Sequence, residues 1–84
     1  MLHVTEAASG YLNDVLDRIN APSDSAVRIV AVPGGLKTTI DEERSGDQHY
    51  DHEGRKVLLL DPEVADRLDG RTLDVEDQHL VCLA

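Results

Sequence analysis

Apolar residues in the first quarter of the chain recur with the period of a helix. Residues 2–4 can begin a strand, and Thr5 is a suitable N-cap for the segment that follows. The next apolar positions lie three or four residues apart, which is typical of one face of an amphipathic helix. Because the residue before a proline avoids the helical region, this helix should end before Pro22. Its apolar stripe consists of Ala8, Tyr11, Leu12, Val15, Leu16 and Ile19.

From residue 26 the pattern changes to that of strands. Residues 26–32 are rich in β-branched side chains, which predicts a strand that is buried on much of both faces. Residues 36–42 alternate between apolar and polar side chains, so we expect a second strand with one face in water. The intervening Pro33-Gly34-Gly35 indicates that the two strands form a hairpin.

The apolar run at residues 56–60 predicts the strand at the centre of the core. Turns are expected at residues 45–47 and 53–55, with a short strand at residues 49–51 between them.

A short second helix is expected after this central strand. Asp61 fits an N-cap and Pro62 a first helical residue, while Gly70 fits a position just past the helix end. Residues 72–75 and 80–83 then predict two further strands. The expected fold class is therefore α+β, mostly β. The side chains on the buried face of the second helix are Val64, Ala65 and Leu68.

Composition limits the chain to one small domain. With 84 residues, 40% of them apolar, residues 1–84 can surround a single core, filled without any Trp or Phe. The 17 acidic residues against 8 basic ones give a net charge of -9, which repels nucleic acids and anionic lipid surfaces. No apolar run is long enough for a membrane span and no secretory signal precedes the domain, so the expected location is the cytoplasm.

The densest group of potential metal ligands is the sequence His49-Tyr50-Asp51-His52. Imidazole and carboxylate groups are ligands for zinc and iron. On an extended segment, His49 and Asp51 point to one face and His52 to the other, so the three converge only if the chain bends. The alternative is a solvated turn around an inward-packed Tyr50. Cys82 lies among apolar residues, where a thiol is expected to behave as a small buried hydrophobe.

Other constellations favour no catalytic function. Gly34-Gly35 lacks the pattern of a phosphate-binding loop, and Ser9-Gly10 lies inside a predicted helix instead of at a nucleophile elbow. The carboxylates, among them Glu42, do not lie in apolar stretches that would shift their pKa values for acid-base work. An enzyme is therefore not expected.

Five segments, taken in order along the chain, carry a further signal. They are residues 2–8 (LHVTEAA), 27–35 (VRIVAVPGG), 46–54 (GDQHYDHEG), 57–62 (VLLLDP) and 68–74 (LDGRTLD). Together they resemble the A-type iron-sulfur carrier family, also called HesB-like. The resemblance implies a compact mixed-sheet domain, mostly β, with one N-terminal helix and one short later helix.

The chain departs from this family at the residues that hold iron or a cluster. The family uses a cysteine just after the glycine loop and a Cys-Gly-Cys near the C-terminus, since thiolates are the usual cluster ligands. Here Leu36 follows the glycines in a stretch shorter than the family's, and the chain ends at Ala84, before that pair would arrive. Cys82 matches no family ligand by position. The chain thus resembles a degenerate member, and no functional residue is carried over.

Three hypotheses follow. The first is a HesB-like domain that no longer binds a cluster, needs no cofactor and acts as a protein-binding or regulatory relative of the carriers. The second is an iron or zinc protein that uses His49, Asp51, His52 and Cys82 from one subunit or from a homodimer. The third is a domain whose last strand, residues 80–83, pairs with another chain along an open sheet edge.

Overall fold

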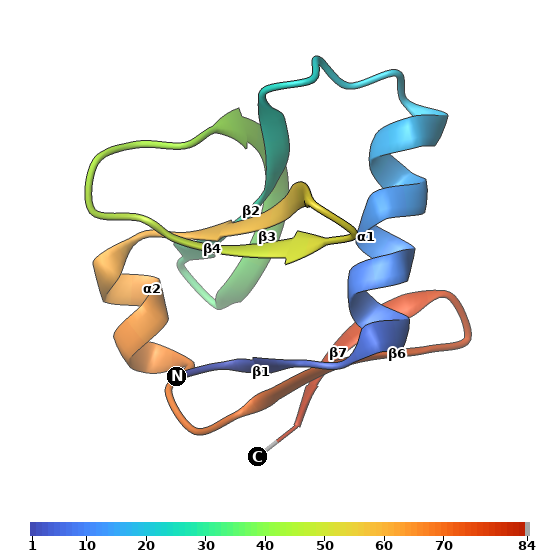
Figure 1. The fold of residues 1–84 in the computed structure, drawn as a ribbon. Helices are drawn as coiled ribbons and strands as arrows, with labels where there is room; N and C mark the ends of the chain where they lie inside the picture. Colours follow the sequence, from blue (N-terminus) through green and yellow to red (C-terminus); the bar gives the residue numbers. More distant parts are fainter. Residues whose placement is uncertain (84) are drawn as a thin grey trace.

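The computed structural model describes residues 1–83, and its elements follow the order that the sequence pattern predicts (Figure 1). Both helices begin at the predicted N-caps. The Thr5 side chain accepts a hydrogen bond from the backbone N–H of Ala8 at 3.0 Å, and Asp61 accepts one from Val64 at 2.9 Å. The elements are β1 (His3–Val4), α1 (Glu6–Arg18), β2 (Ser25–Val32), β3 (Gly35–Glu42), β4 (Gln48–His52), β5 (Arg55–Leu60), α2 (Pro62–Arg67), β6 (Thr72–Glu76) and β7 (His79–Leu83).

The strands form two mixed sheets. The larger sheet has the order β3-β2-β5-β4, in which β2 and β5 are parallel and the other neighbours antiparallel. The smaller sheet has the order β1-β6-β7, in which β1 and β6 are parallel. The prediction of a mixed-sheet, mostly β domain is therefore confirmed.

The core lies where α1 meets both sheets, since this helix contacts β4 and β5 of the larger sheet and β6 of the smaller one (Figure 1). The strand predicted to be central, β5, has four fully buried residues at its end, and α2 covers part of the same sheet. The fully buried large side chains are Leu2, Leu12, Leu16, Val57, Leu58, Leu59, Leu60 and Val64.

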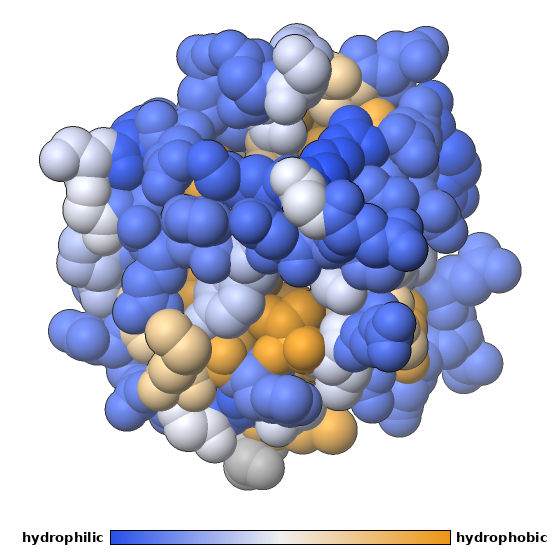
Figure 2. All heavy atoms as spheres, viewed as in Figure 1, coloured by the Kyte–Doolittle hydropathy of each residue, from blue (hydrophilic) through white to orange (hydrophobic). Residues whose placement is uncertain are grey.

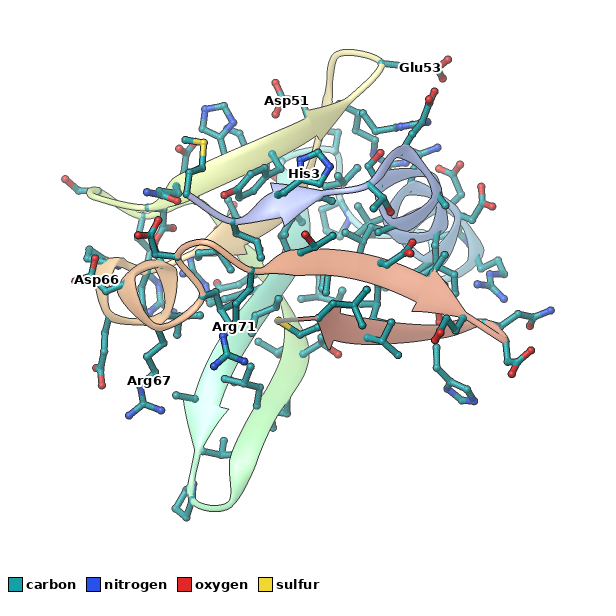
Figure 3. All side chains as sticks on the ribbon, turned by 90° about the horizontal axis from the view of Figure 1, so that it is seen from below. His3, Asp51, Glu53, Asp66, Arg67 and Arg71 are labelled. Atoms are coloured by element: carbon teal, nitrogen blue, oxygen red, sulfur yellow. The ribbon has the colours of Figure 1, made fainter. Side chains whose placement is uncertain are left out.

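The hairpin β2–β3 is more exposed than its pattern predicts. We expected one face of β3 in water, but Leu36 and Ile40, on the apolar face, are 44% and 39% exposed. The register explains this, because β5 pairs only with Val27–Ile29 of β2. The far end of the hairpin therefore continues as a two-stranded ribbon that projects from the molecule (Figure 3).

Candidate functional site

The predicted metal ligands on β4 lie on opposite faces of the strand. His49 Nδ1 and Asp51 Oδ1 are 3.0 Å apart, and both side chains are about half exposed. The His52 ring points instead toward α1, where its Nδ1 is hydrogen-bonded to Ser9 Oγ at 3.0 Å. The alternation expected for an extended segment is therefore observed, and His52 connects β4 to the helix.

Cys82 lies in the other sheet, on the edge strand β7, and it is exposed. The expectation of a buried thiol is wrong, because an edge strand at the rim of a small sheet has no element covering this position. Within residues 1–83, no three His, Cys, Asp or Glu side chains are arranged to hold a metal ion. One chain thus does not bring the four candidates together, and a site shared by two subunits stays a prediction.

Sequence reasoning missed a buried charge cluster centred on Arg28. Its guanidinium donates to both carboxylate oxygens of Asp47, at 3.0 and 2.6 Å, to Asp41 at 2.9 Å and to the carbonyl of Glu42 at 3.0 Å. Arg28 and Asp47 are only 3% and 2% exposed. The available signal was a charged residue inside the apolar run of β2, since a buried charge requires a partner. This cluster fastens the loop before β4 to the hairpin.

The same cluster shifts the pKa values of its carboxyl groups. The hydrogen bonds from Arg28 lower the pKa of Asp47, and the backbone N–H of Glu42 lowers the pKa of Asp41. Glu42 itself was expected to be unshifted, but its hydrogen bond with the carboxyl group of Asp24 raises its pKa. Both carboxyl groups lie at the open surface, in a shallow hollow beside Lys56, where no apolar wall excludes water.

An apolar groove with a volume of about 620 Å³ lies between α1, β3 and β7. One wall is the length of β3 from Leu36 to Ile40, and the opposite wall includes His79 and Leu80 of β7. A second hollow of about 160 Å³ shares Leu36 and Leu80 and extends the groove to Cys82. We call these two hollows together the β3 groove. Its remaining lining residues are Tyr11, Leu12, Val15, Ile19, Val27, Ile29, Lys37, Thr38, Thr39, Leu68 and Leu73.

The face seen in Figure 1 is largely hydrophilic, and the most extensive of its apolar areas lies in the lower half (Figure 2). No helix among residues 1–83 has the length and hydropathy needed to span a membrane.

Comparison of the sequence with models of protein families and with curated proteins gave no match. Comparison of the fold with solved structures did. Escherichia coli SufA, a protein involved in the biosynthesis of iron-sulfur clusters, is similar with a TM-score of 0.71 and 22% identity over 96% of this chain and 80% of SufA. A protein from Aquifex aeolicus, solved by NMR in solution, is similar with a TM-score of 0.70 and 24% identity over 99% of this chain and 90% of that protein. The fold is HesB-like.

In this HesB-like domain, Leu36 follows the glycine turn directly, in a stretch that contains no cysteine. Leu36 lines both hollows of the β3 groove, and Cys82 lines the smaller one. The residues after the glycine turn therefore form part of an apolar wall that has one thiol at its end.

Proposed function

We propose that this HesB-like domain is a protein-binding relative of the iron-sulfur cluster carriers, that it holds no cluster of its own and that it is not an enzyme. The observation that carries the proposal is Leu36, an exposed apolar side chain that follows the glycine turn and lies on the wall of an apolar groove. Exposed apolar surfaces that are hollowed and rimmed by polar groups are typical of protein interaction sites.

The cysteine content supports the loss of cluster binding. Clusters are ordinarily held by several thiolates, and these 84 residues contain one cysteine, Cys82. Two subunits would supply two thiolates, which is fewer than the four of an ordinary cluster site. Within these 84 residues, a carrier-like fold is thus present without the set of thiolates that ordinarily holds a cluster.

Reconstitution tests this proposal. The full chain, purified without a histidine tag or chelators, is incubated with ferrous iron, sulfide and a thiol reductant without oxygen, beside the variant Cys82→Ser. We expect no visible absorption from a cluster and no stoichiometric acid-labile sulfide in either protein after desalting. A cluster that is stoichiometric per chain or per dimer in the wild type and absent from Cys82→Ser would show that the proposal is wrong.

The second candidate function is iron or zinc binding at a site shared between two subunits. The observation that favours it is the exposed His49–Asp51 pair, because a carboxylate beside an imidazole orients a metal-binding ring. Zinc titration of the wild type, His49→Ala, His52→Ala and the control His3→Ala tests this candidate. It requires that His49→Ala and His52→Ala weaken binding and His3→Ala does not, and unchanged affinity in all three variants would exclude it.

A further inference from the structure

Strand β3 is an open sheet edge whose middle part lacks the features that prevent pairing with another chain. It has eight residues and borders only β2; Lys37 lies near one end and Asp41 and Glu42 at the other, while Thr38, Thr39 and Ile40 between them are uncharged. Proteins usually protect such edges with charged residues, prolines or covering elements, because the free backbone groups pair with other strands. The opposite edge strand, β4, differs because it packs against α1.

The β3 groove runs along this open edge. All residues from Leu36 to Ile40 line it, while α1 and β7 form its other walls. A segment that lies in the groove in extended conformation can therefore pair with β3 and place every second side chain against apolar residues. Strand addition of this kind combines affinity from backbone hydrogen bonds with specificity from alternate side chains.

The distribution of ion pairs indicates the charge of the segment. Five of the eight basic residues form ion pairs within residues 1–83, and three do not: Arg18, Lys37 and Arg71. Together with Arg67, whose contact with Glu63 is too long for a hydrogen bond, these three form no side-chain hydrogen bond in this part of the chain. With 17 acidic residues available, intramolecular partners are not scarce.

All three unpaired cations line the β3 groove or the hollows that continue it. Lys37 belongs to the groove itself. Arg18 lines a hollow that shares Tyr11 with one end of the groove and that also contains Asp14 and Asp17, of which Asp17 is already paired with Arg55. Arg71 lines another hollow, which shares Leu36 with the other end and contains no carboxylate. In Figure 3, Arg71 lies beside the projecting hairpin next to Arg67, whose own contact with Glu63 is long at 3.7 Å.

We infer that the β3 groove binds an extended acidic segment of a partner protein, which adds to β3 as a strand and places its carboxylates near Arg18, Lys37 and Arg71. This inference rests on the proposed protein-binding function and specifies its partner. The overall charge of -9 opposes an acidic partner at long range. Salt screens this repulsion beyond about 8 Å at physiological ionic strength, whereas direct contacts with the three cations persist.

Synthetic peptides test the inference on the full chain. The first probe is a capped peptide in which valine and glutamate alternate. Three others replace every glutamate by serine, every glutamate by lysine, or the central glutamate by proline. Binding is measured by amide chemical shifts in NMR spectra and by the rate at which Cys82, the single cysteine and a groove residue, is alkylated.

We expect the glutamate peptide to bind at least about tenfold more tightly than the serine peptide. Its binding should change the amide chemical shifts of residues 36–40 and slow the alkylation of Cys82. The peptide with the central proline should not bind. The lysine peptide should not shift residues 36–40, although the net charge of the protein attracts it. Lys37→Glu should abolish the preference for glutamate, whereas Arg44→Glu, the same charge change outside the groove, should preserve it.

The remaining outcomes separate this inference from the function on which it rests. If the serine or lysine peptide binds along residues 36–40 as tightly as the glutamate peptide, the acidic partner is wrong and the docking groove stands. If the proline peptide binds as well as its parent, strand addition is wrong. If no peptide shifts residues 36–40 or protects Cys82, the inference is overturned and the groove loses its support as a docking site.

Discussion

At the scale of single residues, Arg28 and Asp47 are buried together and joined by two hydrogen bonds. Removing one partner of a buried pair leaves the other charge unpaired and out of water, which costs about 3 to 5 kcal/mol. We therefore expect Arg28→Met to lower the free energy of unfolding by about that amount, measured by urea denaturation at pH 7.

Arg44→Met is the matched control, because Arg44 also contacts Asp41 but is 70% exposed. Exposed ion pairs contribute about 0 to 1 kcal/mol, so this variant should remain close to the wild type. The double variant Arg28→Met, Asp47→Leu should recover much of the loss, since it leaves no unpaired buried charge. Equal losses for Arg28→Met and Arg44→Met would contradict this account of the cluster.

The lowered pKa of Asp47 predicts how stability depends on pH. A carboxyl group whose pKa is lower in the folded state stabilises fully above its ordinary pKa of about 3.9. That contribution is lost as the pH falls through the folded value. The stability difference between the wild type and Asp47→Asn should therefore be largest near neutral pH and shrink in acid. Denaturation at a series of pH values measures it, and a difference that stays constant into acid would show that Asp47 is not the titrating group.

Arg28 and Cys82 show which features of single residues the sequence predicts and which it does not. A charge inside an apolar strand predicts a buried partner, but the partner is 19 residues away and several carboxylates compete for that role. Cys82 has the apolar neighbours of a buried residue. Its exposure depends on β7 lying at a sheet edge, which local pattern does not determine.

At the scale of elements, each helix begins with a side chain that accepts a backbone N–H. Replacing such an N-cap with alanine costs about 1 kcal/mol. We expect Asp61→Ala to lose about this amount and Thr5→Ala to lose more, because the Thr5 hydroxyl also donates to Asp74 at 2.9 Å. Urea denaturation measures both, with the exposed turn residue Ser23→Ala as control. Losses no greater than that of Ser23→Ala would contradict the capping role.

Nearly every element could be predicted from the chain because capping residues, glycine turns and apolar periodicity act locally. The arrangement of the strands could not. β2 pairs with β5 across more than twenty residues, and β1 joins β6 near the other end of the chain. These pairings arise from burial shared between distant segments, and they position the hairpins whose residues line the β3 groove. The β3 groove could therefore not be predicted from the sequence pattern and was identified from the structure.

At the scale of the whole molecule, the excess of acidic residues should destabilise the fold through self-repulsion. Raising KCl from about 20 mM to about 500 mM shortens the screening length from tens of ångströms to a few, which weakens this repulsion. We expect the urea midpoint to rise over that range. Salt screens the buried pair of Arg28 and Asp47 far less. The weakening of this pair should therefore not cancel the stability that the protein gains from reduced repulsion.

A charge-reduced variant provides the control for this salt effect. Asp14, Glu76 and Asp77 are exposed and form no ion pair within residues 1–83. Their amide variants therefore make the net charge less negative without breaking an ion pair. The combined variant Asp14→Asn, Glu76→Gln, Asp77→Asn should be more stable than the wild type at low salt and respond less to KCl. If both proteins gained equally from salt, the effect would not come from net charge. Such a result would also weaken the view that long-range repulsion opposes an acidic segment in the β3 groove.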